Sequence, residues 1–187
     1  MTRLNIGCGY RKREGYLNLD QSLACNPDEI FDIEETPWPF ASNSVSHIAA
    51  IHVLEHIGLT LPTFIRVMKE MYRVLCPGGE LEIEVPHPRS DGYLNGIDHV
   101  RPITIGGMEQ FSKRKCRQYL DRGWPNTPLA LEHDIDFDMT LVVNNVNPIW
   151  AEKNLPEADL IFCANTYFNV IESIKMTLVK VPHDLSP

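Results

Sequence analysis

Several features that would assign this chain to a specialised class are missing from its sequence. No apolar run approaches the roughly 20 residues that a membrane-spanning helix needs. The five cysteines are scattered and form no Cys-x-x-Cys pair, which argues against a disulfide framework and against a cysteine zinc site. No signal peptide precedes the first apolar segment. These absences predict a cytoplasmic protein that is not associated with a membrane.

The chain also lacks an excess of positive charge. Its formal net charge is −8 at pH 7, from 25 acidic and 17 basic residues. Since the sequence-independent part of nucleic-acid binding comes from lysine and arginine, we expect no nucleic-acid partner. Two local basic clusters, at residues 11–13 and 113–117, are compatible with solvated surface. The first follows a glycine turn, where it could instead meet an anionic group of a ligand.

No repeat, low-complexity tract or linker divides the 187 residues, so we expect one domain over residues 1–187. Segments rich in Ile, Leu and Val predict strands over residues 3–7, 16–20, 29–33, 46–51, 80–86, 137–146 and 173–182. Apolar residues at helical spacing predict helices over about 61–75, from Thr104 to just before Gly123, and over about 157–171. This alternation predicts an α/β sheet.

The connections in the first half are short. Only residues 8–15 separate the first two predicted strands, whereas a parallel crossover normally needs a dozen or more residues. Eight extended residues span about 26–29 Å, which is enough to return along a strand of ~17 Å. We therefore expect parallel pairing without helical cover on one face. Apolar surface there should be shielded by a second copy in a homodimer, or by residues 148–172 folding back in a monomer.

Three segments place glycine or polar residues directly after predicted strands or helices. They are Leu4–Gly9, His52–Ile57 and Tyr72–Gly79. Ligands of open α/β sheets bind outside the carboxyl ends of the strands, and all three segments lead there. The sequence therefore predicts a single ligand site that the three segments share.

Acidic residues at strand tips suggest what this site binds. Gly7-Cys8-Gly9 lets the backbone approach a ligand closely. Asp20, at the tip of the second strand, is suited to accept hydrogen bonds from both hydroxyls of a ribose, and Asp32 ends the third strand similarly. The alternative is that Asp20 is a turn residue and that Asp32 caps the following loop.

The segment His52–His56 also matches H-x-x-E-H, in which two histidines of one helix share a zinc ion and the glutamate acts as general base. That chemistry requires all five residues inside a long helix. The preceding run is strand-like, and Pro62 leaves room for only a short turn before the next helix. We therefore expect no metal, and a zinc hydrolase acting through His52, Glu55 and His56 remains an alternative.

Short motifs follow one another in a fixed order over roughly residues 3–104. They are Asn5 to Gly9, Gly15 to Asp20, Asp32 to Phe40, His52 to Ile57, Glu70 to Gly79, Leu81 to Pro86, and Asp98 to Arg101. This ordered set resembles small class I S-adenosylmethionine-dependent methyltransferases of the methyltransferase-11-like branch. The resemblance implies a Rossmann-like methyltransferase fold, with a mostly parallel sheet, a C-terminal antiparallel hairpin and reduced helices in the first half.

The same resemblance implies S-adenosyl-L-methionine as cofactor. The residues expected to contact it are Asn5, Gly7, Cys8, Gly9, Asp20, Gln21, Asp32, Ile33 and His52. The glycine turn should pack on the amino-acid moiety and Asp20 should hold the ribose. Asp32 and Ile33 should border the adenine, and His52 should lie beneath the sulfonium.

The implied reaction is methyl transfer to an oxygen or nitrogen atom of a small-molecule acceptor. A general base helps when the nucleophile is a hydroxyl, and histidine is suited to that role near neutral pH. We predict that His99 is the base and that Asp98 orients it, although a structural His99 that caps the next helix is an alternative. His56, His87 and Arg101 are predicted to border the acceptor together with Asp98. A non-catalytic cofactor-binding or assembly protein would keep the cofactor turn but lack an open acceptor pocket.

Overall fold

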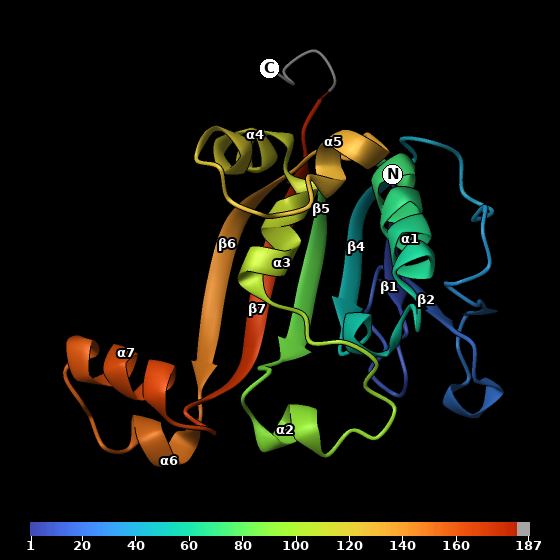
Figure 1. Ribbon diagram of the computed structural model, residues 1–187. Helices are drawn as coiled ribbons and strands as arrows, with labels where there is room; N and C mark the ends of the chain where they lie inside the picture. The colour runs from blue at the N-terminus through green and yellow to red at the C-terminus, as the bar shows by residue number, and fades with distance from the viewer. Residues whose placement is uncertain (183–187) are drawn as a thin grey trace.

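The computed structural model describes residues 1–182, which form a seven-stranded sheet with helices packed on it (Figure 1). The strands are β1 (Thr2–Ile6), β2 (Leu17–Asp20), β3 (Glu29–Ile30), β4 (Val45–Ile51), β5 (Leu75–Pro86), β6 (Phe137–Val146) and β7 (Ile171–Lys180). The helices are α1 (Leu61–Val74), α2 (Asp91–Leu94), α3 (Ile105–Met108), α4 (Lys113–Asp121), α5 (Leu129–His133), α6 (Pro148–Ala151) and α7 (Glu157–Thr166). Single 3₁₀ turns are η1 (Leu23–Cys25), η2 (Leu54–His56) and η3 (Glu109–Phe111).

The strand order across the sheet is β3-β2-β1-β4-β5-β7-β6. The five strands from β3 to β5 pair in parallel, whereas β7 runs antiparallel to both β5 and β6. The predicted α/β fold, with a mostly parallel sheet and a C-terminal antiparallel hairpin, is confirmed. The carboxyl ends of β1, β2 and β4 lie at the same edge, where an open α/β sheet binds its ligands.

The short connection between β1 and β2 does allow these two strands to pair in parallel. Residues Leu4 and Ile6 of β1 pair with Leu17 and Leu19 of β2, and no helix lies between the two strands. Between β2 and β3 the chain makes only the turn η1. The predicted reduction of helices in the first half is therefore confirmed.

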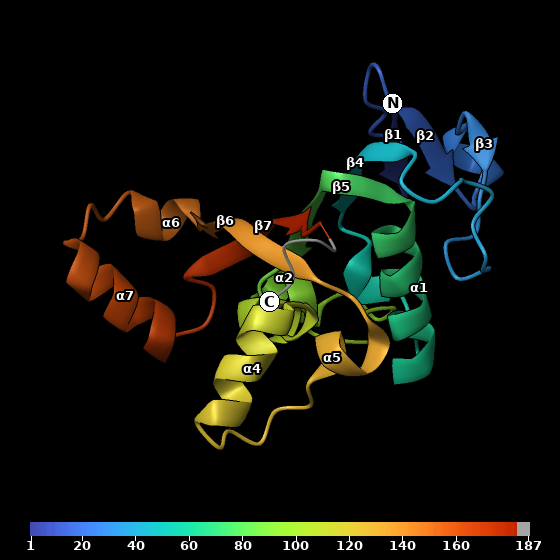
Figure 2. The same cartoon turned by 90° about the horizontal axis from the view of Figure 1, so that it is seen from above.

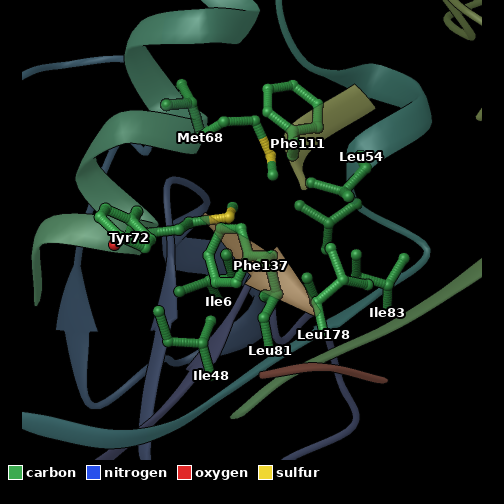
Figure 3. Close-up of a cluster of buried hydrophobic side chains, with 14 of the residues drawn as sticks. Ile6, Ile48, Leu54, Met68, Tyr72, Leu81, Ile83, Phe111, Phe137 and Leu178 are labelled. Carbon is green, nitrogen blue, oxygen red and sulfur yellow. The ribbon is translucent and has the colours of Figure 1, made fainter. Parts of the chain in front are cut away.

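The core lies on the face of the sheet that α1 covers. Thr60 caps this helix by accepting a hydrogen bond from the Thr63 backbone N–H, and the helix then presents an apolar stripe. Figure 3 shows Met68 of this stripe beside side chains from the sheet and from η3. The fully buried side chains that fill this layer include Leu4, Ile6, Ile48, Val67, Met68, Met71, Leu81 and Ile83.

Some element bounds differ from the predicted ones. The third strand extends only over Glu29–Ile30 rather than residues 29–33. The single helix predicted from Thr104 is broken into α3, η3 and α4, because Ser112 starts a new helix by accepting from the Lys115 backbone N–H. The helix predicted to reach residue 171 ends at Thr166. Within the described residues, no helix has both the length and the apolar character that crossing a membrane requires.

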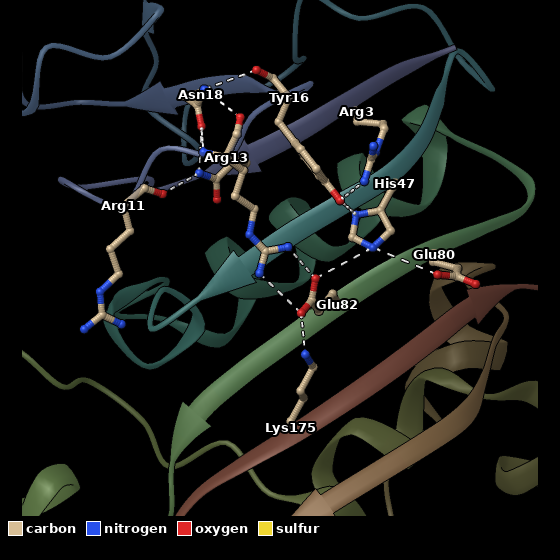
Figure 4. A network of polar contacts seen from close by, with 10 residues as sticks. Arg3, Arg11, Arg13, Tyr16, Asn18, His47, Glu80, Glu82 and Lys175 are labelled. Atoms are coloured by element: carbon tan, nitrogen blue, oxygen red, sulfur yellow. Dashed lines mark hydrogen bonds and ion pairs between the residues drawn. The ribbon is translucent and has the colours of Figure 1, made fainter.

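The sheet face without helical cover is polar across its central strands. Figure 4 shows Arg3, Tyr16, His47, Glu82 and Lys175 side by side on this face. The Glu82 carboxylate accepts from Lys175 Nζ at 2.7 Å, and the Arg3 guanidinium stacks on the Tyr16 ring at 4.0 Å. The expectation of apolar surface on this face is therefore wrong. Charged side chains on alternate residues of β5 make the face compatible with water.

Replacing Glu82 with glutamine should destabilise the protein at neutral pH by about 1–2 kcal/mol, the scale of lost charge-assisted hydrogen bonds. The hydrogen bond from Arg13 at 2.6 Å is the main reason that the pKa of Glu82 is lowered to about 2. A carboxylate with a depressed folded-state pKa stabilises the native state above its unfolded-state pKa, and the stabilisation disappears as pH falls through the folded-state pKa. The difference between wild type and variant should therefore shrink as pH falls from about 4.5 towards about 2.

Urea denaturation as a function of pH measures this difference. The matched control is Glu80→Gln, on the same strand and face, because the Glu80 side chain is 53% exposed and Glu82 is only 12% exposed. Equal losses of stability for the two variants, or a Glu82→Gln loss that does not depend on pH, would contradict the assignment.

The segment between β6 and β7 projects from the domain as an arm. Figures 1 and 2 show α6 and α7 standing away from the sheet at the carboxyl end of β6. No residue of α7 is buried, and Ile161 and Phe162 are exposed. The predicted alternative, in which residues 148–172 fold back over the uncovered face, is therefore wrong.

Candidate functional site

A cavity of about 390 Å³ opens at the carboxyl ends of β1, β2 and β4. It is lined by Gly7, Asp20, Gln21, Phe31, Asp32, Ile33, Glu34, His52, Val53, His56, Ile57 and Asp98. The cavity thus combines one glycine turn, acidic strand tips and an apolar wall. Its volume is in the range of small-molecule and cofactor sites.

The glycine turn after β1 is held by the neighbouring strand. Gly7 has φ of +58°, and a Cβ atom there would lie 2.7 Å from Val53 Cγ2. The Cys8 backbone N–H donates to the Leu19 carbonyl at 3.0 Å, and the Gly9 N–H donates to Asp20 Oδ2 at 2.9 Å. The turn therefore brings bare backbone to the cavity wall, beside the Asp20 carboxylate.

The tips of β2 and β3 supply the polar and apolar sides of the cavity. Asp20 Oδ1 accepts from the Ser22 backbone N–H at 2.8 Å, which fixes its carboxylate at the strand end. Asp32 Oδ1 accepts from the Glu34 N–H at 2.8 Å. Phe31 packs edge-on against Trp38 with 5.4 Å between ring centroids. A rigid aromatic wall therefore stands next to two fixed carboxylates.

The His52–His56 segment is not a helix of the zinc-peptidase kind. His52 directly follows β4 with φ of +55°, and only Leu54–His56 form a single 3₁₀ turn. His52 Nδ1 lies 3.4 Å from Glu55 Oε1, and the hydrogen bond between them raises the pKa of His52. The segment places two imidazoles at the cavity wall instead of along one helix face.

A second cavity of about 660 Å³ adjoins the first, and His52 and His56 line both. It is lined by His52, Glu55, His56, Glu84, Pro86, Ser90, Asp91, Gly92, His99, Asn147, Ile149, Trp150, Asn169, Glu172 and Ser173. The two histidine side chains therefore lie at the boundary between the two cavities.

His99 lines the second cavity with a fixed ring orientation. Its Nδ1 lies 2.7 Å from the Tyr93 carbonyl oxygen, and its ring stacks on Tyr93 with 5.2 Å between centroids. Asp98 does not orient His99 as predicted; its carboxylate lies 3.0 Å from His56 Nδ1. The loop turns between the two residues, so that Asp98 faces the first cavity and His99 the second.

Glu55, His56 and His99 form a cluster in the wall of the second cavity. Each offers a potential metal-ligating atom, and these atoms lie within 4.8 Å of one another. The side chain of Glu55 is 1% exposed, and its Oε2 has no hydrogen-bond partner among the described residues. The cluster therefore combines two oriented imidazoles with an unsatisfied carboxylate oxygen.

Several predicted site residues lie behind the cavities rather than in their walls. Asn5 donates to the Arg11 carbonyl and to Asn18 Oδ1, and so braces the loop that follows the glycine turn. Cys8 is buried, which raises the pKa of its thiol, and neither Cys8 nor Gly9 is a lining residue.

His87 and Arg101 also line neither cavity. Burial lowers the pKa of His87, whose Nδ1 accepts from the Arg89 backbone N–H at 3.1 Å. Arg101 donates to the Gly58 carbonyl and lies over the Phe64 ring at 4.4 Å. Their contacts are those of residues that shape loops.

Sequence reasoning missed most of the second cavity. Trp150 comes from α6 of the arm and Glu172 from β7, both far along the chain from the predicted motifs. One signal was available: Glu80, Glu82 and Glu84 alternate along β5 and so share one sheet face. In the first cavity, Phe31 and Glu34 were missed although they flank the predicted Asp32 and Ile33.

Comparison with known proteins finds similarity to methyltransferases. Residues 18–83 match a family model described as a methyltransferase domain. The matched segment runs from β2 into β5 and includes Asp20, Asp32 and His52–His56. The resemblance drawn from the motifs is thereby confirmed. No curated protein matches the chain.

Solved structures share the fold. A SAM-dependent methyltransferase from Archaeoglobus fulgidus aligns with a TM-score of 0.64 and 15% identity, covering 96% of this chain and 86% of that one. An S-adenosylmethionine-dependent methyltransferase from Mesorhizobium loti aligns with a TM-score of 0.53 and 14% identity, over 96% and 90%. A complex between the Haloferax volcanii Trm112 methyltransferase activator and a methyltransferase contains a match with a TM-score of 0.53 and 14% identity, over 97% and 83%. At these identities the alignments establish a common fold.

Proposed function

We infer that this chain, a class I S-adenosylmethionine-dependent methyltransferase, transfers a methyl group to an oxygen or nitrogen atom of a small-molecule acceptor. The observation that carries the inference is the pair of adjoining cavities that share His52 and His56. One cavity suits the cofactor and the other an acceptor. A non-catalytic cofactor-binding protein would have no need of the second cavity.

The residues of the first cavity fit S-adenosylmethionine. The Asp20 carboxylate is fixed by two backbone N–H groups and can accept from the two ribose hydroxyls. Phe31 and Ile33 offer apolar surface to an adenine ring, and the Gly7 backbone can approach the amino-acid end. The cofactor supplies a methyl group that its sulfonium charge already activates, so the protein mainly has to align the acceptor and exclude water.

His99 is the proposed general base for the acceptor. A neutral imidazole whose Nδ1–H donates to the Tyr93 carbonyl keeps a lone pair on Nε2. That nitrogen can take the proton which a hydroxyl or amine nucleophile loses. His56, held by Asp98, stands beside it with 4.7 Å between ring centroids, at the boundary of the two cavities.

Replacing Asp20 with alanine should weaken S-adenosylhomocysteine binding by ~1–3 kcal/mol, the scale for leaving buried polar groups unpaired. Isothermal titration calorimetry on the folded variant measures the loss. Asp20→Asn keeps an acceptor for the Gly9 N–H and should lose less. Glu14→Ala, which changes an exposed acidic residue of the loop between β1 and β2, is the matched control.

If a folded Asp20→Ala protein binds S-adenosylhomocysteine with unchanged affinity, Asp20 does not contact the cofactor. Failure of the wild-type protein to bind S-adenosylhomocysteine would contradict the proposed function itself. A turnover assay with labelled cofactor and pools of small-molecule acceptors then separates an enzyme from a protein that only binds the cofactor.

We also propose that the protein forms a homodimer, but for a different reason from the one that the sequence suggested. The uncovered face is polar, but the arm exposes Ile149, Ile161, Phe162 and Phe168. Apolar side chains gathered on a projecting segment favour association with a second copy. Light scattering should then give twice the chain mass of 21.3 kDa, and a mass near 21.3 kDa at micromolar concentration would contradict the dimer.

A further inference from the structure

The second cavity carries negative charge that is not offset by lysine or arginine. Glu55, Glu84, Asp91 and Glu172 line it, and its lining contains no lysine or arginine among residues 1–182. No lysine or arginine within that range forms an ion pair with Glu84, Asp91 or Glu172, and the basic groups beside Glu55 are histidines. A concave surface of one sign concentrates ligands of the opposite sign.

Glu55 adds an observation that points to a ligand. Its Oε1 lies 3.4 Å from His52 Nδ1 and 3.9 Å from His56 Nε2, whereas its buried Oε2 accepts no hydrogen bond within the described chain. A buried carboxylate oxygen without a donor is costly. A donor that arrives with a ligand would remove that cost.

Two further carboxylates of the cavity, those of Glu84 and Glu172, are oriented by neutral groups. Glu84 Oε1 accepts from Ser173 Oγ at 3.0 Å and from Asn145 Nδ2 at 3.3 Å. Glu172 Oε1 accepts from Asn147 Nδ2 at 2.8 Å. These hydroxyl and amide donors hold the carboxylates in place without cancelling their charge. Since two strands and the start of the arm fix them, the charge is built into the cavity wall.

We propose that the acceptor bound in the second cavity is a small molecule that carries a positively charged amino group. The inference rests on the proposed function and deepens it, because it names the chemical class of the acceptor. An ammonium group can donate charge-assisted hydrogen bonds to carboxylates from different elements of the cavity. Ile149 and Trp150 of α6 give apolar surface to the rest of such a molecule.

Binding of matched probes to the protein saturated with S-adenosylhomocysteine tests the proposal. One set is tyramine, tyrosol and 4-hydroxyphenylacetate, and a smaller set is ethanolamine, ethylene glycol and glycolate. Within each set only the terminal group changes, from a positively charged ammonium to a neutral hydroxyl to a negatively charged carboxylate. We expect the amine to bind about tenfold more tightly than the alcohol, the ratio expected from one charge-assisted hydrogen bond, and the carboxylate to bind most weakly.

Single substitutions locate the preference. Glu84→Gln and Glu172→Gln should each lower amine affinity about three- to tenfold and leave alcohol and S-adenosylhomocysteine affinity unchanged. Glu80→Gln, on the same strand as Glu84 but outside the cavity, should change none of these affinities. Two carboxylates are tested separately so that a folding defect in one variant leaves the other informative.

Three results would overturn the proposal. They are equal affinity for the members of both sets, preference for the alcohol or the carboxylate, and no amine binding in either set. Elemental analysis that finds one divalent metal ion per chain, lost on His99→Ala, would also overturn it, because the ion would already neutralise the Glu55 cluster. In each case retained S-adenosylhomocysteine binding leaves the proposed function standing, whereas its loss removes both.

Discussion

Replacing His99 with glutamine is expected to lower kcat for methyl transfer by roughly 10²–10⁴-fold, the usual contribution of a positioned general base. Glutamine can still donate to the Tyr93 carbonyl that holds the His99 ring, but it cannot take a proton from the acceptor. Because His99 lines only the second cavity, S-adenosylhomocysteine affinity should stay at the wild-type value. The measurement is steady-state kinetics with an acceptor found by labelled-cofactor screening.

The pH profile separates a base from a structural histidine. A protonated imidazole cannot accept a proton, so the wild-type rate should fall on the acid side, and this limb should disappear in His99→Gln. His133→Gln, in α5 and away from both cavities, is the control and should keep wild-type kinetics. If His99→Gln leaves kcat unchanged, or lowers kcat but keeps the acid limb of the pH profile, His99 is not the general base.

Replacing Gly58 with alanine is expected to destabilise the protein by ~3–4 kcal/mol, in the upper range for single substitutions. Gly58 has φ of +68°, and a Cβ atom there would lie 2.7 Å from both the backbone N and the Cβ of Phe64. Backbone at the start of α1 cannot move aside as a flexible side chain could. The Gly58 N–H also donates to Glu34 Oε1 at 2.7 Å, so the cofactor cavity should lose part of its wall.

Gly78→Ala is the matched control for this experiment. Gly78 has φ of +75°, yet nothing lies within 4 Å of a Cβ atom built there. Its substitution should therefore cost only the backbone strain of about 1–2 kcal/mol. Chemical denaturation of both variants separates the steric cost from the conformational one. Similar losses at the two positions would mean that the chain at Gly58 relaxes.

The sequence was sufficient to predict elements whose local signals agree with their packing. The apolar stripe of α1 and the Ile- and Leu-rich strands were placed within a few residues of their observed bounds. The 104–122 region was not, because apolar spacing continues across Ser112 while the Ser112 side chain starts a new helix there. The polar character of the uncovered face was also not predicted. Charged residues at alternate positions of β5 indicate a polar face only when that face is known to lack helices.

The candidate site was predictable where it follows strand ends. Gly7, Asp20, Asp32 and His52 come together in one cavity because β1, β2, β3 and β4 are parallel neighbours. The second cavity depends on how β6 and β7 pair and on where the arm between them leaves the sheet. Those are long-range contacts that local patterns do not encode, so its carboxylates and Trp150 could not be assigned to it from sequence.

Because no helix follows β1 or β2, different interactions stabilise the two faces of the sheet. On the side of α1 the fold is held by apolar packing, which dissolved ions hardly affect. The loop that follows the glycine turn is held instead by Asn5, by Asn18 and by the Arg13–Glu82 ion pair. Ionic strength and pH therefore act unequally on the molecule. We therefore expect that raising the ionic strength opens the loop after the glycine turn before it affects the packing under α1.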